Sequence, residues 1–146
     1  MMLNNIGYWN IRGAHDISKA IEAKFLLSST HLDLLILCET KLCESLTTQI
    51  ATKIAPTWNM IHNHVHASYG RLMMIYNPLF LSITNSCTHR QYIHTSLSHI
   101  PTNTAFNLTA IYADNNKSQR QQMLDILPTL HITSIPWLRL GDFNYM

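Results

Sequence analysis

The sequence is poor in charged residues and glycine, and each shortage excludes a class of protein. Charged residues make up 12% of the 146 residues, whereas 47% are hydrophobic; soluble domains usually carry ~25% charged residues. This balance excludes an intrinsically disordered chain, which combines high charge with low hydrophobicity, and a coiled coil, which is rich in Glu, Lys and Arg. With only 4 glycines, a collagen-like or Gly-rich linker sequence is excluded too. The length and composition predict one globular domain with its own core.

Cysteines and long apolar runs are also scarce. Three cysteines, Cys38, Cys43 and Cys87, are an odd number, which argues against a closed disulfide framework and for a reducing, intracellular compartment. The longest apolar run, Leu34 to Cys38, is far shorter than the ~18 residues of a membrane-spanning helix. The N-terminus lacks the basic and apolar regions of a signal peptide. We therefore expect an intracellular protein with no membrane partner.

Neither sign of charge is in large excess. The 10 basic and 8 acidic side chains give a formal net charge of +2. Proteins that bind nucleic acid mainly through charge have a strongly basic surface. A nucleic-acid-binding role would therefore need a shaped site rather than a broad basic patch.

The first half of the chain alternates between strand and helix patterns. Residues 5–11 are short, apolar and aromatic, which is typical of a strand. A helical stripe follows, with Asp16 or Ser18 as its N-cap. Residues 32–39 form a nearly continuous apolar run, which is typical of a strand covered on both faces, as in parallel sheets. Residues 43–54 show a weaker helical pattern.

The second half contains a series of short strand patterns, one helix and a last strand. The strands are predicted over residues 71–77, 80–85, 91–98 and 104–113. Their spacing favours an antiparallel meander or a sandwich layer. A helix is predicted over residues 119–130, and the last strand runs from Trp137 to Leu140. The order of elements indicates a mixed α/β fold without internal repeats.

Polar side chains lie at or just after the ends of four of the predicted strands. They are Asn10, Glu39, the pair Tyr112 and Asn115, and the pair Asp142 and Asn144. In α/β sheets, binding sites gather beyond the carboxyl ends of the strands. Mg²⁺ commonly takes one or two protein carboxylates and leaves room for substrate phosphate oxygens. The strand ends therefore predict a site for a divalent cation beside a phosphate ester.

Five segments then occur in a characteristic order. They are WNIRG (9–13), LCETKL (37–42), GRLMMIYNP (70–78), TAIYADN (109–115) and PWLRLGDFN (136–144). Together they resemble the endonuclease/exonuclease/phosphatase superfamily. The closest resemblance is to the apurinic-type endonuclease domain of plant LINE-like (non-LTR) retrotransposon polyproteins. The resemblance implies an α/β (α+β) fold, a four-layer α/β sandwich of the DNase I-like type.

The resemblance also implies a role for each strand-end residue. Glu39 and Asn10 match the residues that bind the metal ion, Mg²⁺ or Mn²⁺. Tyr112 matches the tyrosine that helps to hold the scissile phosphate. Asp142 matches the aspartate that orients or deprotonates the attacking water, and Asn144 the asparagine that contacts a phosphate oxygen. The implied reaction is metal-assisted hydrolysis of phosphodiester bonds.

Two further residues are candidate contacts to phosphate or to a nucleic-acid backbone. Asn115 ends the TAIYADN segment, and Arg12 lies within WNIRG. The expected partner is DNA, which would place the protein in the nucleus, and no small-molecule cofactor is expected.

The chain departs from the superfamily pattern at its C-terminal end. The superfamily's Ser-Asp-His run, whose histidine contacts the scissile phosphate, is absent from the 146 residues. We therefore expect residues 1–146 to be the N-terminal part of such a domain, a partial sandwich that lacks its C-terminal half and is inactive in nicking. Arg139 replaces a small apolar residue on a buried strand, and we expect it to be exposed.

Two alternative functions and one possible metal site remain open. The chain is a non-catalytic retroelement remnant, or it is a phosphatase or another phosphodiesterase of the same superfamily. Separately, His62, His64 and His66 alternate along the sequence, which would place them on one face of a strand. Such a triplet can bind Zn²⁺ or Cu²⁺, but a solvated strand face is the favoured interpretation.

Overall fold

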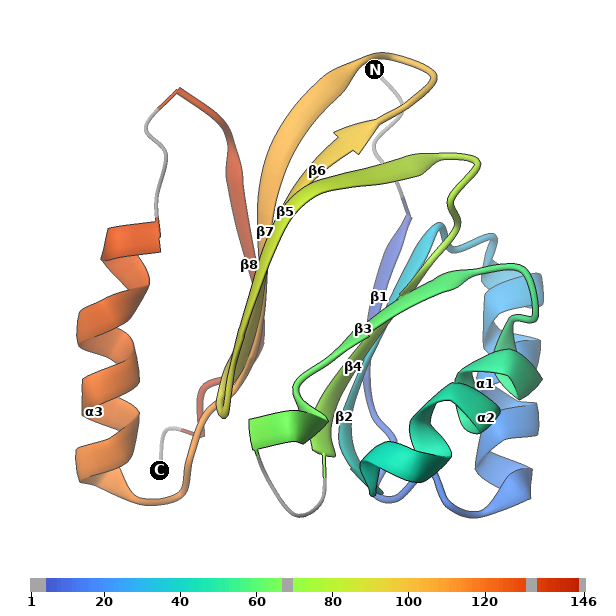
Figure 1. The fold of residues 1–146 in the computed structure, drawn as a ribbon, viewed down its shortest axis with the longest axis horizontal. Helices are drawn as coiled ribbons and strands as arrows, with labels where there is room; N and C mark the ends of the chain where they lie inside the picture. Colours follow the sequence, from blue (N-terminus) through green and yellow to red (C-terminus); the bar gives the residue numbers. More distant parts are fainter. Residues whose placement is uncertain (1–4, 67–69, 131–133, 145–146) are drawn as a thin grey trace.

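The computed structural model describes residues 5–66, 70–130 and 134–144. Within these ranges the chain forms four layers, in which two four-stranded sheets pack face to face between outer helices (Figure 1). The first sheet has the strand order β1-β2-β4-β3, and the second has the order β5-β6-β7-β8. This architecture confirms the predicted four-layer α/β sandwich.

The first sheet and its helices come from the first half of the chain. Its strands are β1 (Ile6–Asn10), β2 (Leu34–Leu42), β3 (Asn59–His62) and β4 (Gly70–Tyr76), with helices α1 (Ile17–Thr30) and α2 (Glu44–Ile54). Strands β1 and β2 are parallel, whereas β4 runs antiparallel to both β2 and β3. Helices α1 and α2 cover the outer face of this sheet (Figure 1).

The second sheet is an antiparallel meander with one parallel strand added. Its strands are β5 (Leu81–His89), β6 (Tyr92–His99), β7 (Thr104–Tyr112) and β8 (Trp137–Asp142), with helix α3 (Lys117–Ile126) on its outer face. Strand β8 runs parallel to β7 and pairs Tyr112 with Asp142. The meander was predicted from the spacing of the strand patterns, but the first strand of that predicted series, residues 71–77, forms β4 and belongs to the first sheet. Strand β5 extends beyond the predicted residue 85, because its pairing with β6 continues through polar residues to His89 and Tyr92.

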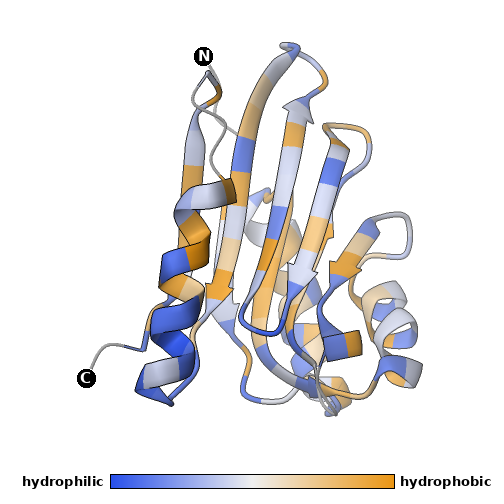
Figure 2. Cartoon of the chain, turned by 60° about the vertical axis from the view of Figure 1, so that its left-hand side comes forward, coloured by the Kyte–Doolittle hydropathy of each residue, from blue (hydrophilic) through white to orange (hydrophobic). Residues whose placement is uncertain are grey.

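Three hydrophobic clusters hold the layers together. Two of these clusters lie on opposite faces of β2. Leu35 and Leu37 pack against α1 and α2, whereas Ile36 and Cys38 pack against the second sheet. This confirms the prediction that both faces of the strand are covered. The third cluster joins α3 to the second sheet through Met123 and its neighbours. In Figure 2, the first turns of α3 are hydrophilic and the hydrophobic residues lie toward its end.

Helix termini follow their capping residues. Asp16 is the N-cap of α1, as predicted, and its Oδ1 accepts a hydrogen bond of 2.9 Å from the Ser18 amide. Helix α3 begins two residues earlier than predicted, because the Asn116 side chain caps it by accepting from the Gln119 amide at 3.1 Å. It ends at Ile126 and continues as a 3₁₀ turn, where a proline at position 128 lacks the amide that an α-helix needs.

The prediction that three histidines share a strand face is wrong. Strand β3 ends at His62, and His64–His66 form a 3₁₀ turn. His64 is 2% exposed rather than solvated, because its ring nitrogens hydrogen-bond the hydroxyls of Thr40 and Thr47 at 3.2 and 2.5 Å. The buried histidine therefore serves the packing of α2 and β2.

Two surface expectations can be compared with the structure. Arg139 is exposed, as predicted, and its guanidinium lies 4.8 Å from the centre of the Trp137 ring. Among the described residues, none of the helices has the length and apolar character needed to cross a bilayer.

Candidate active site

Four strands bring their carboxyl ends to one end of the sandwich, the lower end in Figure 1. The parallel pairs β1–β2 and β7–β8 explain this, because parallel strands end at the same edge. Two side-chain hydrogen bonds then join the sheets. The Tyr8 hydroxyl donates to the Ile111 carbonyl at 2.8 Å, and the Tyr112 hydroxyl donates to Oε1 of Glu39 at 2.6 Å.

An irregular stretch of β2 determines where Glu39 points. By simple alternation, Glu39 would face the helices, as Leu35 and Leu37 do. Instead Glu39 and Lys41 have φ angles of 53° and 54°, and the pairing of β2 with β4 shifts register between Cys38 and Leu42. Left-handed backbone is uncommon for residues other than glycine, and irregular pairing re-aims side chains. The carboxylate therefore reaches Tyr112 of the opposite sheet.

The surroundings of Glu39 keep it ionised. The Tyr112 hydroxyl has the largest effect and lowers the pKa of the Glu39 carboxyl, which burial partly opposes. A hydrogen bond from the Asn10 side chain and the charges of Lys41 and Arg12 lower the pKa further. In turn, burial and the Glu39 carboxylate raise the pKa of Tyr112. Tyr112 is therefore a neutral donor and Glu39 an anion at neutral pH.

Asn10 and Arg12 lie beside this carboxylate at the end of β1. The Oδ1 atom of Asn10 accepts a hydrogen bond of 3.2 Å from the Arg12 amide. Arg12 is exposed and has a φ of 53°. Its positive charge is close enough to lower the pKa of Glu39. The structure thus brings Asn10, Arg12, Glu39 and Tyr112 together.

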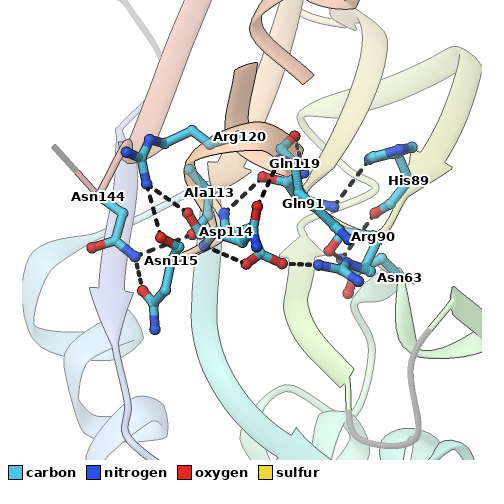
Figure 3. Close-up of polar contacts among 11 residues, drawn as sticks. Asn63, His89, Arg90, Gln91, Ala113, Asp114, Asn115, Gln119, Arg120 and Asn144 are labelled. Atoms are coloured by element: carbon cyan, nitrogen blue, oxygen red, sulfur yellow. Dashed lines mark hydrogen bonds and ion pairs between the residues drawn. The ribbon is translucent and has the colours of Figure 1, made fainter. Parts of the chain in front are cut away.

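The remaining predicted residues form a second group at the end of β8. The Asp142 carboxylate accepts a hydrogen bond of 2.8 Å from the Asn144 amide. The Asn144 side chain donates to Oδ1 of Asn115 (Figure 3). The Ala113 amide donates to the Asp142 carbonyl at 2.8 Å, which holds the two chain segments side by side.

A buried thiol links the two groups electrostatically. Burial, with smaller contributions from the carboxylates of Glu39 and Asp142, raises the pKa of Cys38 to about 11. The geometry agrees: Tyr112 pairs with Asp142 across β7 and β8 and donates to Glu39, so the two carboxylates lie at the same end of the molecule.

Three residues near the site were not among the candidates predicted from the sequence. Tyr8 not only packs in the core: its hydroxyl also accepts a hydrogen bond of 3.3 Å from the Asp142 amide. The Arg71 guanidinium lies 5.7 Å from the centre of the Tyr112 ring, and Lys41 lowers the pKa of Glu39. One signal could have identified Tyr8, because it precedes Asn10 by two residues and so shares its face of β1.

The donor atoms at Glu39 are suited to Mg²⁺ or Mn²⁺. Among the described residues, no three or more His, Cys, Asp or Glu side chains gather as a metal site, so a closed site of the zinc type is not formed there. An ionised Glu39 beside the Asn10 amide offers oxygen ligands only, which Mg²⁺ and Mn²⁺ prefer. Mg²⁺ needs few protein ligands because it keeps several waters.

No family model matches the sequence, and no curated protein matches it. Solved structures do match. An endonuclease/exonuclease/phosphatase family protein from Bacteroides thetaiotaomicron superposes with a TM-score of 0.69 over 97% of this chain, at 12% identity. The chain has the endonuclease/exonuclease/phosphatase fold. It covers 63% of that protein's chain.

Two further structures share the endonuclease/exonuclease/phosphatase fold. TDP2 from D. rerio, solved with a single-strand DNA product, has a TM-score of 0.72 and 13% identity over 98% of this chain. The Bacteroides thetaiotaomicron mannosyl-6-phosphatase Bt3783 has a TM-score of 0.69 and 12% identity over 97% of this chain. This chain spans 61% and 66% of their respective lengths. At these identities the likeness establishes the fold alone.

Proposed function

We propose that this chain carries the metal-binding part of a site for Mg²⁺-assisted hydrolysis of phosphodiester bonds in DNA. The observation that carries the proposal is the contact between the Tyr112 hydroxyl and the Glu39 carboxylate across the two sheets, with the Asn10 side chain beside the same carboxylate. An ionised carboxylate, a neutral phenol and an amide are suited to hold a cation and a phosphate oxygen together.

The residues have distinct roles in this proposal. Glu39 and Asn10 would hold the cation, which when bound neutralises charge on the phosphate and the leaving oxygen. Tyr112 stays protonated, so it orients Glu39 and can donate to a phosphate oxygen. Asp142 is exposed and accepts from the Asn144 amide, which leaves carboxylate lone pairs to orient or deprotonate an attacking water.

The amides supply neutral contacts to an anionic substrate. Asn115 carries an NH₂ group that can donate to phosphate oxygens without adding charge, and that of Asn144 can do so by exchanging its contact with Asn115 or Ala113 for one with phosphate. Arg12 is exposed beside Asn10 and can contact the nucleic-acid backbone, which would also make binding depend on salt. Action on DNA would take place in the nucleus.

The finer assignment is to an endonuclease of the type found in plant LINE-like retrotransposons. The five ordered segments of the sequence support it, and TDP2 from D. rerio, of the same fold, was solved with a DNA product. For the 146 residues alone we propose cation and DNA binding with little or no nicking. Removing one member of a catalytic unit commonly costs several orders of magnitude in rate, and these residues contain no Ser-Asp-His run.

DNA binding by the chain tests the proposal. Affinity for a fluorescent DNA duplex is measured at fixed salt with Mg²⁺ and with EDTA, for the unmodified chain, Glu39→Gln and the control Glu22→Gln on α1. We expect Mg²⁺ to tighten binding for the unmodified chain and for the control, but not for Glu39→Gln. Equal binding with and without Mg²⁺ would contradict the proposal. Supercoiled plasmid in the same buffer should stay largely intact, and efficient relaxation lost in Glu39→Gln would overturn the expected inactivity.

A second candidate is a phosphatase, favoured by the fold shared with the mannosyl-6-phosphatase. The two candidates differ in the ligand that Mg²⁺ helps to bind. A sugar phosphate monoester that competes with the DNA duplex at lower concentration than a dinucleotide phosphodiester would favour the phosphatase, and the opposite order would favour the nuclease.

A further inference from the structure

Asp114 is an acidic residue that precedes Asn115 and is almost buried, with 8% of its surface exposed. Burying a carboxylate is unfavourable unless it is paired with a charge and fully hydrogen-bonded. Arg90, in the turn between β5 and β6, forms an ion pair with it (Figure 3). The Oδ1 atom of Asp114 accepts a hydrogen bond of 2.8 Å from the Asn116 amide. Both carboxylate oxygens of Asp114 are therefore used.

The backbone of Asp114 is held by side chains from two other elements. Its amide donates to Oε1 of Gln91 at 2.7 Å, and its carbonyl accepts from the Arg120 guanidinium at 3.0 Å. Gln91 is 2% exposed and also donates to the Gln119 carbonyl on α3 at 3.0 Å. The loop between β7 and α3 is therefore fixed by the β5–β6 turn on one side and by α3 on the other.

The β5–β6 turn is itself attached to the first sheet. Asn63 follows β3 and is 1% exposed. Its side-chain amide donates to the carbonyls of His89 and Arg90 at 3.0 and 3.1 Å, and its Oδ1 accepts from the Leu72 amide at 2.9 Å. Contacts thus run without a break from the first sheet, through the turn, to Asp114 (Figure 3).

At its far end this network reaches two predicted phosphate contacts. The Asn144 side chain donates to Oδ1 of Asn115 and to the Ala113 carbonyl, the latter at 3.5 Å. Arg120 also donates to the Asn115 carbonyl at 3.3 Å. Asn115 is exposed, so its position depends on the loop that carries it and not on core packing around its side chain.

We propose that Arg90 and Asp114 are a positioning pair that fixes the β7–α3 loop and so holds Asn115 and Asn144 in the geometry that receives a phosphate. Neither residue touches substrate in this account. That the pair affects DNA binding rests on the proposed function. That the pair fixes the positions of Asn115 and Asn144 does not. The ion pair also cancels a negative charge next to residues that would receive an anion.

The side-chain amide signals of Asn115 and Asn144 in NMR spectra report on this geometry directly. The variants are Arg90→Met, Asp114→Asn and the control Asp125→Asn, an exposed carboxylate on α3. In the first two variants we expect both amide signals to move toward the positions of solvated asparagine and to exchange faster, whereas the control leaves them unchanged. Mg²⁺-dependent DNA affinity should fall about fivefold or more, the equivalent of roughly one hydrogen bond. Mg²⁺ affinity without DNA should change less than about twofold, because the pair does not touch Glu39.

Arg90 is only partly buried, with 37% of its side chain exposed, so we expect Arg90→Met to fold. If Asp114→Asn does not fold, Arg90→Met alone tests the proposal. Unchanged amide signals in folded Arg90→Met would overturn the proposal, as would an equal loss of affinity for Mg²⁺ and for DNA. Failure of the proposed function has a different signature. In that case the unmodified chain shows no Mg²⁺-dependent DNA binding, yet the amide signals still respond to Arg90→Met.

Discussion

At the scale of single residues, different neighbours determine the backbone and the charge of Glu39. Its left-handed backbone belongs to the irregular stretch of β2, and such conformations persist only where the surrounding structure enforces them. The lowering of its pKa comes first from the Tyr112 hydroxyl, with Asn10, Lys41 and Arg12 contributing. The position and the charge of the carboxylate can therefore be changed separately by mutation.

Tyr112→Phe tests the electrostatic part. Without the hydroxyl, the pKa of Glu39 should rise toward its ordinary value near ~4.3, which an NMR titration of the Glu39 carboxyl measures. A depressed pKa contributes stability that is present above the ordinary pKa and lost as pH falls through the folded value, so the variant should lose less stability below about pH 4.3. Tyr76→Phe, on β4 opposite the first residue of β2, is the control. An unchanged Glu39 pKa in Tyr112→Phe would show that another group keeps it low.

The variant Gly141→Ala tests the pairing of β7 with β8, which positions Asp142. A Cβ at this position would lie 2.0 Å from the Ile111 carbonyl oxygen, which cannot move without breaking the β7–β8 pairing. Gly141→Ala should therefore lower the free energy of unfolding in urea by about 1–3 kcal/mol. Gly7→Ala is the matched control, since its Cβ would meet the flexible Leu32 side chain at 2.7 Å, and it should cost less. Equal losses would contradict the backbone clash.

At the scale of elements, most strands and helices were predictable from local patterns, and the departures arise where distant residues intervene. The apolar run of β2 and the Asp16 cap are local signals. The burial of His64 depends on hydrogen bonds with Thr40 and Thr47, which are far along the chain, and the left-handed backbone at Glu39 lies where the pairing of β2 with β4 shifts register. Alternating histidines predict a strand face only if the strand continues, and β3 ends at His62.

His64 gives a pH dependence with a defined sign. The Thr47 hydroxyl donates to the Cys43 carbonyl, so Nδ1 of His64 carries its proton and Nε2 accepts from Thr40. Burial lowers the pKa of His64 to about 4. The unfolded chain binds a proton below about pH 6.5 while the folded chain does not, so stability is complete above pH 6.5 and is lost as the pH falls toward 4.

Urea unfolding at pH 7 and pH 5 measures this effect. Between pH 7 and pH 5, the free energy of unfolding of the unmodified chain should fall by on the order of 2 kcal/mol because of His64. In His64→Gln it should fall correspondingly less. Burial also lowers the pKa of His62, His89 and His94, so the comparison between variants carries the test. Equal losses in the two proteins would contradict a buried neutral His64.

At the scale of the whole molecule, contacts between the sheets assemble the site. The sequence could place an amide or an acid at each of four strand ends, because the strand patterns end there. It could not place Tyr8 against Ile111 or Arg90 against Asp114, since such contacts join residues far apart and leave no periodic pattern. The candidate residues were therefore predictable, whereas the groups that orient them were not.

Tyr8→Phe tests the link between the sheets. The hydroxyl donates to the Ile111 carbonyl and accepts from the Asp142 amide, so its removal should cost about 1–2 kcal/mol of stability. Hydrogen exchange at the Asp142 amide should also become faster. Unchanged exchange and stability would contradict a role for the Tyr8 hydroxyl in joining the two sheets.

The most direct test of a shared cation site is paramagnetic broadening of amide signals by Mn²⁺ at substoichiometric concentration. The account predicts that broadening is strongest at Asn10 and Glu39 in the first sheet and at Tyr112 and Asp142 in the second, that Mg²⁺ competes it away, and that Glu39→Gln abolishes it. Broadening confined to one sheet, or centred on the histidines near residue 64, would contradict a site built where both sheets meet.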